Sequence, residues 1–149
     1  MVECDFPECT TFGAVMRFAL ELEKGASGVY DELAKEPKAA AAAETFKALS
    51  AAHKKRGELL EFTRQQKLNE MTLEPISELK RENYLIDTHA PKGADVKQAA
   101  AFASRMEATS AKFYSDSARV AKPLTAEAAR VMDRLGKENL ANKAKLDAL

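Results

Sequence analysis

The chain has 149 residues, enough for one sizeable core, and we expect residues 1–149 to form a single domain. Its 23 basic and 23 acidic side chains cancel, so the charge gives no reason to expect binding to nucleic acid or to an anionic membrane. Apolar runs such as Ala39–Ala43 are far shorter than the roughly 20 residues of a membrane span. The first residues include acids and proline instead of a basic region followed by an apolar block, so we expect no signal peptide and a cytoplasmic location.

Apolar residues recur at helical spacing in four stretches of the chain. We expect helices at residues 10–36, 38–68, 95–121 and 125–147. Thr10 or Thr11 can cap the first helix and Thr125 the fourth, whereas Pro37 and Pro123 break the chain between neighbouring helices. Alternating patterns typical of strands are almost absent, so we predict an all-α fold.

The connections between these helices predict how they are arranged. The second helix opens with an alanine tract, and its apolar face includes Leu60 and either Phe62 or Thr63. Residues 69–94 contain prolines and weak periodicity, with a short helix at most within Ile76–Leu85, so we interpret them as a long crossover. Two short connections and one long one predict a four-helix bundle of two antiparallel hairpins, with the third helix parallel to the second.

The chain also repeats itself, and the repeat contains acidic and aromatic side chains. Glu23 and Tyr30 recur as Glu107 and Tyr114, each 84 residues later. A second pair of segments corresponds with an offset of 86, namely Phe46-x-x-Leu49-x-x-x-His53-x-x-Arg56 and Met132-x-x-Leu135-x-x-x-Asn139-x-x-Asn142. Two helix pairs related in this way can place four helices, each bearing polar side chains, around one centre.

These segments resemble the ferritin-like superfamily, and most of all the rubrerythrin-type proteins, over about residues 12–147. The resemblance rests on Ala19-x-x-x-Glu23-x6-Tyr30, on Ala103-x-x-x-Glu107-x6-Tyr114 and on the apolar frames of the second and fourth helices. It implies a ferritin-like four-helix bundle. Members bind two irons with one Glu from each of two helices and a Glu-x-x-His from each of the other two. They commonly pair through helix faces, which implies a homodimer here.

Carried over position by position, the resemblance places Glu23 and Glu107 at the two single-Glu positions, with Tyr30 and Tyr114 packed beside the site. His53 and Arg56 stand where the family has one Glu-x-x-His, and Asn139 and Asn142 stand where it has the other. Both Glu-x-x-His motifs are therefore missing. An arginine cannot lose its proton in a protein and has no lone pair for a metal, so its guanidinium would repel one.

We therefore hypothesise that a charge-neutral polar network of these eight residues replaces the dimetal centre. Two glutamates alone in a bundle core would be costly unless paired. Arg56 can pair with them, as can His53 when protonated, while the asparagines and tyrosines complete the hydrogen bonds. With no catalytic residue and no cofactor, the protein would act as a binding or interaction module whose small-molecule ligand the sequence does not name.

Plainer interpretations of the same residues remain open at this stage. Glu23 and Glu107 could be solvated helix residues whose spacing coincides, and residues 53–56 could be an exposed basic patch. Tyr30 and Tyr114 could be ordinary core tyrosines. His89, in the crossover, is expected to face solvent.

Two other functions compete with the interaction module. A rubrerythrin-type oxidoreductase, reducing peroxide or oxidising iron, would hold iron, manganese or zinc at Glu23, Glu107 and His53. A thiol sensor would use Cys4 and Cys9, although their spacing differs from the Cys-x-x-Cys of efficient redox motifs. Two cysteines do not form a disulfide framework, and we expect plain thiols, with a reversible disulfide or an intermolecular site as alternatives.

Overall fold

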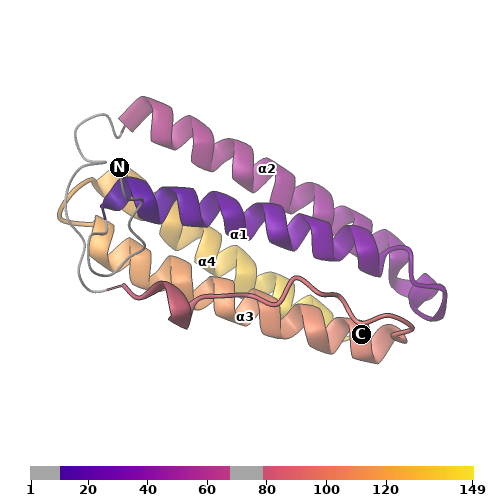
Figure 1. Ribbon diagram of the computed structural model, residues 1–149. Coiled ribbons are helices and arrows are strands. Elements are labelled where there is room, and N and C mark those ends of the chain that lie inside the picture. The colour runs from indigo at the N-terminus through magenta and orange to yellow at the C-terminus, as the bar shows by residue number, and fades with distance from the viewer. Residues whose placement is uncertain (1–10, 68–78) are drawn as a thin grey trace, which may run out of the picture.

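The computed structural model describes residues 11–67 and 79–149, and within them the protein is all-α, as predicted (Figure 1). The main helices are α1 (Phe12–Leu33), α2 (Ala43–Lys67), α3 (Val96–Ala121) and α4 (Ala126–Asp147). Two short 3-10 helices, η1 (Pro37–Ala42) and η3 (Arg81–Asn83), lie in the connections. Each predicted helix is present, with its ends moved by up to five residues.

The helices pack as two hairpins, α1 with α2 and α3 with α4, and the hairpins form a bundle through contacts of α1 with α3 and of α2 with α4. Figure 1 shows α2 and α3 running in the same direction, because the chain between them travels along the length of the bundle before α3 begins. The described part of this crossover is fixed to both hairpins. Tyr84 packs edge-on against Phe113 of α3, and the Gly93 amide donates to Glu36, just beyond α1, at 2.9 Å.

Three of the helices begin with side-chain caps. The Thr11 hydroxyl accepts from the amide of Ala14, so the first helix is capped by the second of the two predicted threonines, and Thr125 caps α4 as predicted. Asp95 and Gln98 form a full capping box at the start of α3. Such caps satisfy amide groups that have no partner within the helix, and each contributes about 1 kcal/mol.

The connection between α1 and α2 differs from the prediction. The first helix ends at Leu33 instead of residue 36, because Glu36 precedes proline and is extended, with ψ of 120°. The alanine tract forms η1, with a kink at Ala39, and α2 begins only at Ala43. Ala39 and Ala42 are buried and η1 contacts α3, so tertiary packing overrides the helix propensity of alanine here.

The structure decides between two predicted core residues and shortens one predicted helix. Phe62 is 61% exposed, and Thr63 instead faces inward and donates to the Leu59 carbonyl at 2.8 Å. Thr63 shares a face with Leu60, whereas Phe62 lies about 200° around the helix from it. The short helix expected within Ile76–Leu85 is observed only as η3, and residues 76–78 lie outside the described part.

The core has two apolar clusters, one toward each end of the bundle. Phe12, Phe18, Leu60, Phe113 and Leu135 belong to one cluster. Val29, Leu33, Phe46, Leu49 and Leu146 belong to the other. Buried polar residues of all four helices lie between these clusters, so the middle layer of the bundle is held together by hydrogen bonds and charges and not by apolar packing.

The internal repeat extends to the close contacts within each hairpin. Ser27 of α1 meets Ser50 of α2, with their hydroxyls 3.1 Å apart. The residues 84 and 86 positions later are Ala111 and Gly136, and a Cβ added at Gly136 would lie 3.5 Å from the Ala111 carbonyl oxygen. Small residues at equivalent positions thus let the two helices of each hairpin approach each other closely.

None of the helices in the described residues is long and apolar enough to cross a bilayer.

Candidate functional site

The middle layer of the bundle brings together the eight polar residues singled out by the repeat. Glu23 and Tyr30 come from α1, His53 and Arg56 from α2, Glu107 and Tyr114 from α3, and Asn139 and Asn142 from α4. Glu23 is 2% exposed, Glu107 0%, His53 1% and Arg56 5%. Glu23 and Glu107 are therefore not solvated helix residues. Charges this deeply buried must be paired and hydrogen-bonded to be tolerated.

Glu107 accepts hydrogen bonds from three helices. Its Oε2 accepts from the Tyr30 hydroxyl at 2.6 Å and from His53 Nε2 at 2.8 Å. Its Oε1 accepts from the amide nitrogens of Asn139 at 2.7 Å and Asn142 at 3.2 Å. Four donors therefore occupy the roughly four lone-pair positions of this carboxylate.

Glu23 is surrounded in a similar way from the other side of the bundle. Its Oε1 accepts from His53 Nδ1 at 2.6 Å, and Arg56 Nε makes an ion-pair contact with the same oxygen at 3.1 Å. Its Oε2 accepts from the Tyr114 hydroxyl and, at 3.2 Å, from Arg56 Nη2. Each tyrosine thus donates to the glutamate of the other hairpin, so the two halves are tied together across the core.

His53 lies between the two carboxylates and donates to both. A carboxylate oxygen only accepts hydrogen bonds, so both ring nitrogens must carry protons and the ring is an imidazolium. Burial lowers the pKa of His53, but the hydrogen bonds and charges of Glu107 and Glu23 outweigh it and raise the pKa from 6.5 to about 9. The imidazolium therefore carries a charge at neutral pH, and it also stacks on the Tyr30 ring.

The charges of the layer cancel. Two carboxylates face one imidazolium and one guanidinium, and the amides of α4 are neutral. Burial raises the pKa of Glu107, but its hydrogen bond to His53 and the charge of that ring bring the pKa below its usual value. Burial also lowers the pKa of Arg56, and the negative charge of Glu23 more than restores it. Burial and the neighbouring carboxylates hold the pKa values of Tyr30 and Tyr114 well above 10, so both phenols stay protonated donors.

Residues 53–56 divide between the core and the surface at helical spacing. His53 and Arg56, three residues apart, point inward, whereas Lys54 and Lys55 between them are exposed. The sequence pattern of an exposed basic patch therefore applies to only half of the segment. His89 faces solvent, as predicted, and its backbone and ring contact the Asp87 carboxylate.

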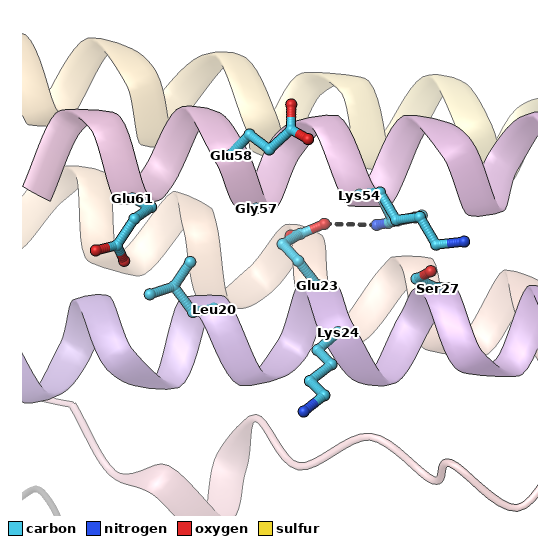
Figure 2. Close-up of a pocket in the computed structure, with 9 residues that line it drawn as sticks. Leu20, Glu23, Lys24, Ser27, Lys54, Gly57, Glu58 and Glu61 are labelled. Carbon is cyan, nitrogen blue, oxygen red and sulfur yellow. Dashed lines mark hydrogen bonds and ion pairs between the residues drawn. The ribbon is translucent and has the colours of Figure 1, made fainter.

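A surface groove of about 490 Å³ between α1 and α2 reaches this layer (Figure 2). Glu23 and His53 lie at its base, beside Gly57, whose missing side chain leaves the space above Glu23 open. In Figure 2 the Glu23 side chain points from α1 toward α2, while Lys24 points away from the gap. This groove was not predicted from the sequence, in which Gly57, within the predicted second helix, is the feature that could have indicated it.

The donor set of this layer does not suit a metal ion. Each oxygen of Glu107 already accepts two hydrogen bonds, and Glu23 accepts from His53, Tyr114 and Arg56. Both nitrogens of His53 are protonated, and the Arg56 guanidinium also makes an ion-pair contact with Glu23. No group of three or more His, Cys, Asp or Glu side chains in the described residues is arranged to hold a metal. A metal at Glu23, Glu107 and His53 would need the imidazolium to lose a proton and the guanidinium to move.

The other predicted site residues and the comparisons add little. Cys4 and Cys9 lie outside the described residues, so the expectations for these thiols stay predictions. Sequence reasoning missed a second polar contact, which is partly buried: the Ser50 hydroxyl donates to Asp31 at 2.5 Å, beside Ser27. Comparison of the chain with protein-family models, curated proteins and solved structures gave no match.

Proposed function

We propose that this protein is a ferritin-like bundle of rubrerythrin type in which a charge-neutral polar network replaces the dimetal centre, and that it acts as a non-catalytic binding or interaction module. The observation that carries the proposal is the saturation of Glu23 and Glu107. Glu23 receives four contacts, of which one comes from His53, two from Arg56 and one from Tyr114. Glu107 also receives four, from His53, Tyr30 and the two asparagines of α4. In this arrangement the imidazolium and guanidinium supply the positive charge that metal ions supply in the family.

The arrangement of the helices supports the ferritin-like part of the proposal. Two hairpins, a crossover along the bundle and parallel α2 and α3 are the topology that the resemblance implies. The residues aligned by the 84- and 86-residue offsets also meet in one layer. Without the Glu-x-x-His motifs, the bundle keeps its fold because the two apolar clusters and the ion pairs hold it together.

The first experiment measures metal in protein purified from cells supplied with iron, manganese and zinc. We expect less than stoichiometric metal in the wild type, because a metal would have to displace a proton and a guanidinium from buried positions. Stoichiometric metal that is lost in Glu107→Ala protein would instead support the rubrerythrin-type oxidoreductase. The Cys4→Ser variant, tested for a mass change under oxidant, addresses the thiol sensor separately.

A second experiment restores the family's ligands. The quadruple variant His53→Glu, Arg56→His, Asn139→Glu, Asn142→His recreates both Glu-x-x-His motifs on the existing frame. If the fold is ferritin-like, this variant should bind two divalent metal ions, because four carboxylates and two imidazoles would then face the bundle axis.

The matched control adds Glu23→Gln to the quadruple variant. This change removes one carboxylate and leaves a side chain of the same size. Metal binding should weaken markedly in this control. A quadruple variant that folds with the same helicity but binds no metal would contradict the ferritin-like alignment of the four helices. The homodimer implied by the resemblance stays a prediction, which light scattering on the purified protein would test.

A further inference from the structure

The groove between α1 and α2 has at its base a carboxylate that can accept one more hydrogen bond. Oε1 of Glu23 is contacted twice, but only His53 Nδ1 donates a hydrogen bond to it. The other contact, with Arg56 Nε at 3.1 Å, is an ion pair, and this nitrogen has no hydrogen-bond partner in the described residues. A carboxylate oxygen accepts about two hydrogen bonds, so one position on Oε1 remains. Both oxygens of Glu107 already accept two.

A glycine keeps the groove open above this carboxylate. The volume is about 490 Å³, within the roughly 300–1,000 Å³ common for small-molecule sites. In Figure 2, Leu20 and Glu23 rise from α1 toward α2, and Gly57 lies on the side of α2 that faces them. The Lys24 and Glu58 side chains extend away from the gap. A Cβ added at Gly57 would lie 3.8 Å from the Cβ of Glu23, so a side chain there would occupy the opening.

The second hairpin is closed at the corresponding place. Gly57 corresponds to Lys143, which lies 86 residues later. The Lys143 ammonium donates to Asp147 at 2.7 Å, and the Ser104 hydroxyl of α3 donates to the same carboxylate at 2.5 Å. These three side chains bridge α3 and α4, whereas a groove separates α1 from α2. The opening above Glu23 is therefore a difference between the two halves of the repeat and not a general result of how the hairpins pack.

The charges around the groove favour an uncharged ligand. The polar layer at its base is neutral, and an added ion would leave a net charge buried at low dielectric. At the rim, Lys54 lies 3.7 Å from Asp31 and Glu61 lies 3.2 Å from Arg64, so these ions already have partners. Both ring nitrogens of His53 are engaged, so this residue has no free donor for a carbonyl or carboxylate of the ligand.

We propose that this groove binds a small neutral alcohol, whose hydroxyl donates to Oε1 of Glu23 while its alkyl part packs against Leu20 and Gly57. A hydroxyl needs one acceptor at the base, and its own lone pairs can face the solvent at the open side. Hydrogen bonds to a charged group are stronger than those between neutral groups, so the carboxylate favours a ligand with a donor. The inference names a ligand class for the binding module, and in that respect it rests on the proposed function.

The test titrates the full chain with 1-butanol and, separately, with methyl propyl ether, and follows the backbone amide signals of Ser27 and Gly57 by NMR. Both residues line the groove. The two probes have the same formula, but only the alcohol has a donor. 1-Butanol should bind with a Kd of about 10 mM, ordinary for a ligand of this size. The ether should bind about tenfold more weakly, because it leaves the hydrogen bond to the carboxylate unmade.

A substitution that fills the groove provides the second arm. Gly57→Leu places an apolar side chain in the opening and improves helix propensity, so the variant should fold and should bind 1-butanol more than about tenfold more weakly. Gly28→Leu is the matched control. It makes the same exchange at an exposed position of α1 outside the groove, with nothing within 4 Å of the new Cβ, and should change affinity less than about twofold.

The outcomes separate this site from the proposed function. Equal affinities for the alcohol and the ether, binding that persists in Gly57→Leu protein, or butylammonium that binds as tightly as 1-butanol would each overturn the alcohol site. Wild-type protein that binds neither metal nor 1-butanol would overturn the site as well and leave the module proposal intact. Metal bound at Glu23 would instead overturn the proposed function.

Discussion

Replacing His53 by glutamine should change how the stability of this protein depends on pH. His53 donates to two buried carboxylates, and its pKa rises from 6.5 to about 9 on folding. Between these two values the native protein holds a proton that the unfolded chain has released. The stabilisation from the imidazolium is therefore complete below about pH 6.5 and is lost as the pH rises through about 9.

The size of the effect follows from this shift. Each pH unit in that interval changes the free energy of unfolding by about 1.4 kcal/mol for one proton. From pH 6.5 to about 9 the wild type should lose about 3 kcal/mol that the His53→Gln variant does not lose. Glu107 acts in the opposite direction. Folding lowers the pKa of Glu107, so the Glu107 carboxylate stabilises the protein at pH values above its unfolded-state pKa. This contribution is lost as the pH falls through the folded-state pKa.

The assay is urea unfolding of both proteins at several pH values from 6 to about 9.5, compared as a difference so that other titrating groups cancel. His89→Gln is the matched control, because the chain has two histidines and His89 is exposed. It should follow the wild type. Nitrogen NMR should also show both ring nitrogens of His53 protonated at pH 8. Parallel curves for the wild type and His53→Gln, or a neutral ring at pH 8, would refute the bridging imidazolium.

Two further predictions concern the ion pair and the helix glycines. Arg56→Met should destabilise the protein by roughly 3–5 kcal/mol, because it leaves the two buried carboxylates of Glu23 and Glu107 with only the His53 imidazolium as a counterion. Adding Glu23→Gln should restore part of the loss, and strictly additive free energies from chemical unfolding would argue against a direct pair. Gly28→Ala should raise the stability by roughly 0.5–1 kcal/mol because nothing lies within 4 Å of the new Cβ. Gly25→Ala should gain less, since its Cβ would meet Thr88 at 3.0 Å, and equal melting temperatures for the two variants would contradict this packing.

The helices could be predicted because their signals are local. Pro37 and Pro123 separate the hairpin members, and Thr11 and Thr125 cap the following helices. The form of η1 could not be predicted in the same way. Its alanines favour an α-helix, and only the packing of the segment against α3 explains the kink at Ala39. The helix propensity of alanine favours an α-helix there, but the packing of the segment against α3 determines its conformation.

The members of the polar layer could be predicted from the internal offsets, but their hydrogen bonds could not. The spacing placed both tyrosines beside the glutamates without indicating that Tyr30 would reach Glu107 and Tyr114 would reach Glu23. That exchange depends on how the two hairpins face each other, which is a property of the assembled bundle. The groove between α1 and α2 was missed for a similar reason, since Glu23 and His53 at its base are far apart in the sequence.

The unequal distribution of charge between the two hairpins affects which helices can associate. In the core layer, the α1–α2 hairpin carries one carboxylate and two cations, whereas the α3–α4 hairpin carries one carboxylate and neutral amides. Two first hairpins facing each other would bury surplus positive charge, and two second hairpins would bury carboxylates without counterions. Both mismatched assemblies are penalised by the low dielectric of the interior. The core residues that differ between the two hairpins therefore favour packing of the α1–α2 hairpin against the α3–α4 hairpin over packing of either hairpin against a copy of itself.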